Sequence, residues 1–164
     1  MTYQKGVALV EVIAALGVSA LVITALVSLA ISTLRTSLDS KLLLEGTKLA
    51  NREIEMVRAY RDKPDVSWED YIKTLALDNG CTVGSFCHMN KQTGYPASGS
   101  EIVGSGMERI TIGFYITDPS TADGTIDITS PPPVVRVNVS VTWKIGDKDK
   151  GSYIYTDLSN WRSK

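Results

Sequence analysis

Apolar residues dominate the first fifth of the chain, and two different periodic patterns follow them. No charged residue occurs among the 23 positions from Val12 to Leu34. A helix needs roughly 20 residues to cross the hydrocarbon core of a bilayer. The run is therefore long enough to span a membrane, and we predict a spanning helix that ends at Leu34.

Beyond Leu34 the pattern becomes amphipathic, which predicts a helix with one buried face over residues 35–62. Its apolar positions are Leu38, Leu42, Leu49, Met56 and Tyr60. Lys63-Pro64 ends the pattern, because the residue before a proline avoids the helical region. One continuous helix from Val7 to Asp62 would be about 84 Å long at 1.5 Å per residue. Two helices separated by a kink at Gly46 are the alternative.

Residues 63–164 have the composition of one globular domain. Ser67 followed by Asp70 is a helix N-cap signal, and Asn79-Gly80 is a stop signal, so a short helix is expected over residues 67–78. The segment 80–106 is rich in Gly, Ser, Thr and Asn and is predicted to be a loop region with room for one short hairpin.

Period-two alternation of apolar and polar residues appears in the last third of the chain. It predicts strands over Arg109–Thr117, Val134–Ile145 and Ser152–Leu158, with a polar turn at Gly146–Gly151. Clean alternation is typical of antiparallel sheets that are buried on one face only. The fold class expected is α+β: an antiparallel sheet of three or four strands within residues 108–161, packed on the amphipathic half of the long helix.

Composition and cysteine content limit the kinds of binding and catalytic site that the chain can form. The net charge is −1, so the chain as a whole has no basic footprint for nucleic acid. The two cysteines, Cys81 and Cys87, are expected to form a disulfide if the domain is exported, which would contribute about 2 kcal/mol through loop closure. Together with His88 they would supply at most three metal ligands, and His88 is the only histidine. We assign no catalytic, metal or cofactor-binding residue.

Two further features of the apolar run concern helix association. Glu11 is an acidic residue at its head, where an unpaired carboxylate is expensive. Small or hydroxylated residues recur at helical spacing, a pattern that lets helices approach closely in lipid; they are Gly17, Ala20, Thr24, Ser28 and Ser32. Simple tolerance of such residues in a spanning helix is the alternative for this stripe. For Glu11 the alternative is a carboxylate that reaches the lipid headgroups.

The head of the chain resembles a known family. A short leader ending in Lys5-Gly6, four apolar residues from Val7, Glu11 and a long apolar helix are similar to the class III signal of type IV pilins and type II secretion pseudopilins. The segments Val139–Trp143 and Leu158–Trp161 resemble the C-terminal strands of minor pilins of type IV pili. Many type IV pilins carry a proline midway along the apolar helix, whereas the first proline here is Pro64. Whether this helix partly unwinds in a filament is left open.

The resemblance implies a maturation and assembly route. Residues 1–6 would be a leader that the prepilin peptidase removes after Gly6, with methylation of the new terminus at Val7, and residues 7–34 would form the membrane and filament-core helix. The freed amine of one subunit could then neutralise Glu11 of its neighbour. The implied partners are other pilin subunits, the prepilin peptidase, an inner-membrane assembly platform and, before assembly, membrane lipid.

A cleaved secretory signal and a plain membrane anchor are the alternative interpretations of the head of the chain. A cleaved secretory signal would have a shorter apolar core, although Val18-Ser19-Ala20 and Ser28-Leu29-Ala30 are possible cleavage sites. A plain membrane anchor on a periplasmic binding module fits the length but assigns no role to Glu11. Within the family, a major pilin, a minor pilin and a secretion pseudopilin all remain open. A minor pilin is favoured, with the N-terminus cytoplasmic before assembly.

Overall fold

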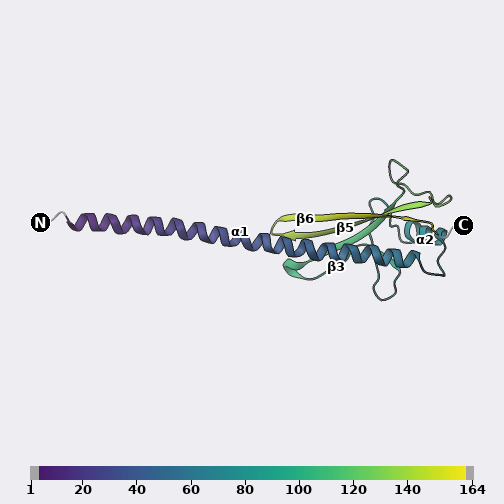
Figure 1. Cartoon of the computed structure of the whole chain (residues 1–164), viewed down its shortest axis with the longest axis horizontal. Coiled ribbons are helices and arrows are strands. Elements are labelled where there is room, and N and C mark those ends of the chain that lie inside the picture. The colour runs from purple at the N-terminus through teal and green to yellow at the C-terminus, as the bar shows by residue number, and fades with distance from the viewer. Residues whose placement is uncertain (1–3, 162–164) are drawn as a thin grey trace. The chain divides into compact units, whose positions relative to one another are not determined.

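The computed structural model describes residues 4–161, with side chains described from Leu9 onward except that of Met107. Its first element, α1, runs without interruption from Gln4 to Arg61 (Figure 1). No break occurs at Gly46, so the alternative of two kinked helices is not observed. The chain divides into two compact units, one that ends at Ser40 and one that begins at Lys41. Each unit therefore contains part of α1.

The second unit contains an antiparallel sheet of six strands. In space their order is β2-β1-β4-β5-β6, and β3 also pairs with β4. The strands are β1 (Cys87–Met89), β2 (Pro96–Ser98), β3 (Glu101–Val103), β4 (Ile110–Thr117), β5 (Val134–Ile145) and β6 (Lys148–Ser159). The long strands β4, β5 and β6 correspond to the three predicted from the alternating pattern. The α+β class with a long helix on an antiparallel sheet, a pilin-like arrangement, is thus confirmed.

Two local expectations need correction. The sheet has six strands rather than three or four, because the segment predicted as a loop region contributes β1, β2 and β3. β3 and β1 share one edge of β4: β3 pairs at Ile110–Ile112, whereas β1 pairs at Phe114. The predicted turn Gly146–Gly151 is also shorter than expected. Gly146, with φ of +59°, lies in a two-residue connection between β5 and β6, and pairing resumes at Lys148.

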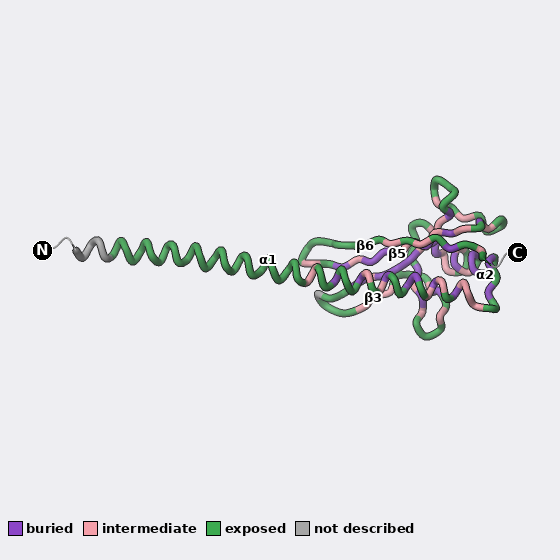
Figure 2. Tube along the Cα trace, in the orientation of Figure 1, coloured by how far each residue is buried: buried purple, intermediate pink, exposed green. Residues whose placement is uncertain are grey.

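Within the second unit, α1 packs on one face of this sheet (Figure 2). The odd-numbered residues of β5 from Val135 to Trp143 are all buried and form the centre of the core. The buried helix positions are Leu42, Gly46, Ala50, Glu53, Ile54, Val57 and Tyr60. Leu42 and Tyr60 were expected there, but Leu49 and Met56 lie half-buried at the flanks. At the centre of the buried face, the small residues Gly46 and Ala50 face the sheet instead, and the helix lies close to the sheet there.

A short helical segment closes the end of the domain. α2 (Trp68–Lys73) continues into a π-helical turn, η1 (Thr74–Asp78). Ser67 caps α2, because its hydroxyl accepts a hydrogen bond from the backbone N–H of Asp70 over 3.1 Å. The buried indole N–H of Trp68 donates to the carbonyl of Pro132 over 2.9 Å. The helix is thereby tied to the proline-rich segment that leads into β5.

Candidate functional site: the exposed apolar helix and the disulfide junction

The N-terminal part of α1 presents apolar side chains in every direction. From Leu9 to Leu34, 14 large apolar residues are between 47% and 73% exposed. Among the described residues, this is the one helix long and apolar enough to cross a membrane, and none of its most apolar stretch is buried within the chain. Such a surface is unfavourable in water, and the length and composition of the helix are compatible with a membrane span.

The predicted association residues occupy defined positions on this helix. At 100° per residue, Gly17, Ala20, Thr24 and Ser28 fall within an arc of about 80°. The side chain of Glu11 is exposed and lies about 135° around the helix from the centre of that stripe. Glu11 and the small-residue stripe therefore lie on different faces of the helix. The side chains of Lys5 and Val7 are outside the part of the chain whose side chains the structure describes, and so is Gly6.

Packing and hydrogen bonding distinguish the members of the stripe. A Cβ at Gly17 would meet no atom within 4 Å in the single chain, so the fold of the subunit does not require glycine there. The hydroxyl of Thr24 donates to the carbonyl of Ala20 over 2.8 Å. Ser19 likewise donates to Ala15 over 2.8 Å. These bonds satisfy hydroxyl groups that would otherwise be unpaired in lipid. No hydrogen bond of the Ser28 or Ser32 hydroxyl is present within residues 9–161.

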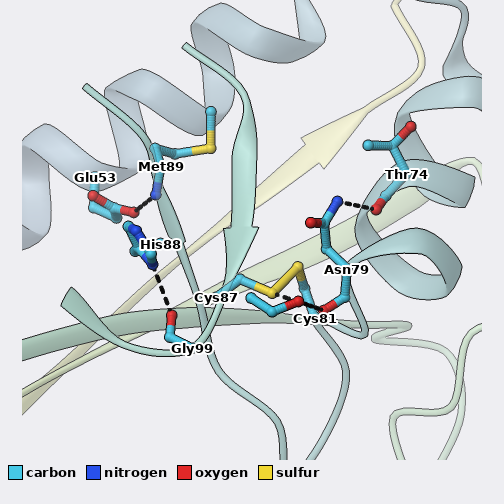
Figure 3. The surroundings of a disulfide bond; sticks show 9 residues. Glu53, Thr74, Asn79, Cys81, Cys87, His88, Met89 and Gly99 are labelled. Carbon is cyan, nitrogen blue, oxygen red and sulfur yellow. Dashed lines mark hydrogen bonds between the residues drawn. A yellow bond between two sulfur atoms is a disulfide. The ribbon is translucent and has the colours of Figure 1, made fainter. Parts of the chain in front are cut away.

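The two cysteines form the expected disulfide (Figure 3). Their Cα atoms are 5.4 Å apart, and both residues are fully buried. The bridge joins Cys81, three residues beyond the end of η1, to the first residue of β1. Backbone bonds support the same junction: the N–H of Cys81 donates to Leu75 over 2.8 Å, and its carbonyl accepts from Ile116 over 2.8 Å. The disulfide therefore fixes the short helical segment against the centre of the sheet.

His88 lies beside this junction. Its Nδ1 is 2.9 Å from the carbonyl of Gly99, which places the proton on Nδ1 as the donor (Figure 3). Among the described residues, no group of three His, Cys, Asp or Glu side chains is arranged to hold a metal ion. The His88 bond joins β1 to the residue after β2, and the disulfide joins β1 to the segment after η1.

Glu53 was not singled out from the sequence, yet it lies in the core at 3% exposure. Its carboxylate accepts a hydrogen bond from the backbone N–H of Met89 in β1 (Figure 3). Alternate N–H groups of an antiparallel strand point to opposite sides. The backbone N–H of Asn90 donates to the carbonyl of Tyr95, on the β2 side of β1. The backbone N–H of Met89 therefore points to the other side, toward β4. No strand hydrogen bond is available there, because β1 pairs with β4 only at Cys87. Glu53 supplies the missing acceptor, and burial raises the pKa of its carboxyl group.

The chain was also compared with protein-family models, curated proteins and solved structures. None of the three comparisons finds a match.

Proposed function

We propose that this chain is a structural subunit, a pilin or pilin-like protein, of a type IV pilus-like filament. Before assembly, α1 holds the subunit in the inner membrane with its N-terminus in the cytoplasm. After removal of residues 1–6, the same helix leaves the lipid and packs against the helices of neighbouring subunits. Assembly would thus move the apolar surface of α1 from lipid into contact with the helices of neighbouring subunits.

The observation that carries the proposal is the contrast between the two units of the chain. The second unit completes a core of its own, in which the helix positions facing β5 are buried. The first unit has 14 large apolar side chains that the subunit itself does not cover. A plain anchor would account for this surface as well, so the argument for polymerisation rests on two residues that an anchor does not need.

Glu11 is the first of these residues. A carboxylate near the bilayer core costs up to about 2.5–3.5 kcal/mol when unpaired. No basic residue lies between Lys5 and Arg35. Cleavage after Gly6 would also remove Lys5, so no basic side chain would remain within two helical turns of Glu11. Cleavage after Gly6 would create an amine at Val7, and in a staggered stack of helices this amine would meet Glu11 of the next subunit. Mutual neutralisation would then set the register between subunits.

Gly17 is the second. Glycine in a helix interior is about 0.8–1 kcal/mol less favourable than alanine, and packing within the subunit does not require it. Close approach of another helix would explain why a glycine occupies this position. Since Gly17 and Glu11 lie on different faces, the proposal requires at least two neighbouring helices for each subunit, as in a helical filament.

Processing is tested by mass spectrometry of the native protein. The expected product begins at a methylated Val7. A native protein that retains Met1–Gly6 and stays monomeric would identify it as a membrane anchor and refute the proposal.

Assembly is tested with Glu11→Ala. We expect the variant to be inserted and processed normally but to enter sheared filaments at least tenfold less than the native subunit, since 1.4 kcal/mol corresponds to a factor of ten. Glu45→Ala is the matched control, because Glu45 is an exposed glutamate on the same helix. Equal filament yields for the two variants would exclude the pairing of Glu11 with the Val7 amine.

A further inference from the structure

The face of the sheet that is turned away from α1 has an unusual composition. Val139 and Val141 of β5 point toward the helix side, so Ser140 and Thr142 point to the opposite face. Cross-strand pairing extends this face into two rows of mostly small residues. The rows are Thr111–Thr142–Gly151 and Gly113–Ser140–Tyr153. The result is a floor of short side chains in the middle of the sheet.

This floor is the bottom of a groove of about 220 Å³, and every residue that lines the groove is uncharged. Phe86 forms one wall, and its ring is fixed edge-on against Tyr115 at 5.6 Å between centroids. Tyr153 forms the other wall and is 73% exposed. Gly113 lets Ser100 and Phe86 lie close against the sheet, because a Cβ there would lie 2.9 Å from Ser100 Oγ and 3.0 Å from Phe86 Cβ.

Four hydroxyl groups line the groove without a protein partner. Neither Ser140, which is only 7% exposed, nor the other three makes a side-chain hydrogen bond to any described residue. The other three are Ser100, Thr111 and Thr142. A hydroxyl group donates once and accepts twice, so the four together offer both donors and acceptors to a ligand.

A second groove continues from the first and shares Thr111 and Thr142 with it. It has a volume of about 490 Å³ and adds two cationic side chains, Arg109 and Lys144, and one acidic side chain, Asp149. Neither cation forms an ion pair with another described residue. The two grooves together present aromatic walls, a hydroxyl floor and a cationic end.

We propose that this outer face binds an acidic oligosaccharide. A pyranose ring would stack on the exposed ring of Tyr153 while its hydroxyl groups bond to the hydroxyl floor, and a carboxylate on an adjoining sugar would lie at Arg109 and Lys144. Single-stranded nucleic acid fits less well, because it requires a basic track along the phosphates. Here only two cations are present, one acid lies beside them, and the chain has a net charge of −1. The groove belongs to the single subunit, so binding requires no polymerisation.

The test is isothermal titration of the full chain with tetragalacturonate, maltotetraose and a four-residue oligothymidylate. A polyoxyethylene detergent keeps the chain soluble and carries no competing sugar. We expect saturable binding of tetragalacturonate that weakens with added salt, and at least tenfold weaker binding of maltotetraose. Tyr153→Ala should weaken tetragalacturonate binding at least tenfold, and Lys144→Ala should reduce its salt dependence.

Tyr155→Ala is the matched control. Tyr155 is a 65% exposed tyrosine of the same strand, but it packs under the guanidinium of Arg136 and does not line the groove. Its removal should leave tetragalacturonate binding unchanged. Equal loss of binding in the Tyr153 and Tyr155 variants, tighter binding of the oligothymidylate, equal binding of maltotetraose, or no binding of any probe would each overturn the assignment.

Discussion

Two glycines of α1, Gly17 and Gly46, are expected to respond differently to the same substitution. Gly46 faces the sheet, where a Cβ would lie 3.0 Å from Val141 Cγ1 and 3.4 Å from Trp143 Cζ3. Gly17 has no atom within 4 Å of the same position. Replacement by leucine should therefore perturb the domain at Gly46 but not at Gly17.

The magnitude follows from two opposing effects. Overpacking of a closely packed core costs about 1–3 kcal/mol, and the upper part of that range applies because even the first added carbon is already tight. Leucine in place of glycine gains about 1 kcal/mol of helix propensity. For Gly46→Leu we expect the free energy of unfolding to fall by about 1–2 kcal/mol. Gly17→Leu receives the propensity gain without the clash.

Urea unfolding of the full chain in detergent measures both variants. Trp143 is 5% exposed and lies next to the substituted position, so its contribution to the fluorescence of the three tryptophans should change when α1 separates from the sheet. With a slope of about 1–3 kcal/mol per molar urea, the midpoint for Gly46→Leu should fall by roughly 1 M, and that for Gly17→Leu should not fall. A Gly46→Leu midpoint equal to that of the native chain would show that the helix does not pack against Val141 as described.

Three further predictions concern single features of the domain. Burial raises the pKa of Glu53, so this group adds stability below its ordinary pKa, and that contribution is lost as pH rises through the folded-state pKa. Glu53→Gln keeps an acceptor for Met89 and should remove this loss in unfolding curves measured across pH; an unchanged pH dependence would contradict it. The double variant Cys81→Ala, Cys87→Ala should lower the free energy of unfolding by about 2 kcal/mol, a difference that disappears when the native chain is reduced. The hydroxyl of Tyr71 is buried without a partner among the described residues, so Tyr71→Phe should raise the thermal midpoint by the equivalent of about 1 kcal/mol; a lower midpoint would reveal a partner.

Local sequence patterns were sufficient to predict the long helix and the long strands. The charge-free run and the amphipathic stretch predict α1, because helical periodicity continues over many turns and averages out exceptions such as the half-buried Leu49. Strict alternation likewise predicts β4 and β5, since every second residue must point to the core. The short strands β1, β2 and β3 have three residues each, too few to show a period. They become strands because β4 and a hairpin partner supply their hydrogen bonds.

The features of the candidate sites that could be predicted are likewise those that depend on residues close together in the sequence. Spacing along the chain and composition were enough to predict the apolar helix, with Glu11 at its head, the stripe of small residues and the pairing of Cys81 with Cys87. The three-dimensional fold was needed to show that Glu53 is buried and bonded to Met89, that Gly46 rather than Leu49 faces the sheet, and that Ser140 lines a groove with Phe86 and Tyr153. These features join residues that are distant in the chain, and no local pattern records which distant residue will cover a given side chain.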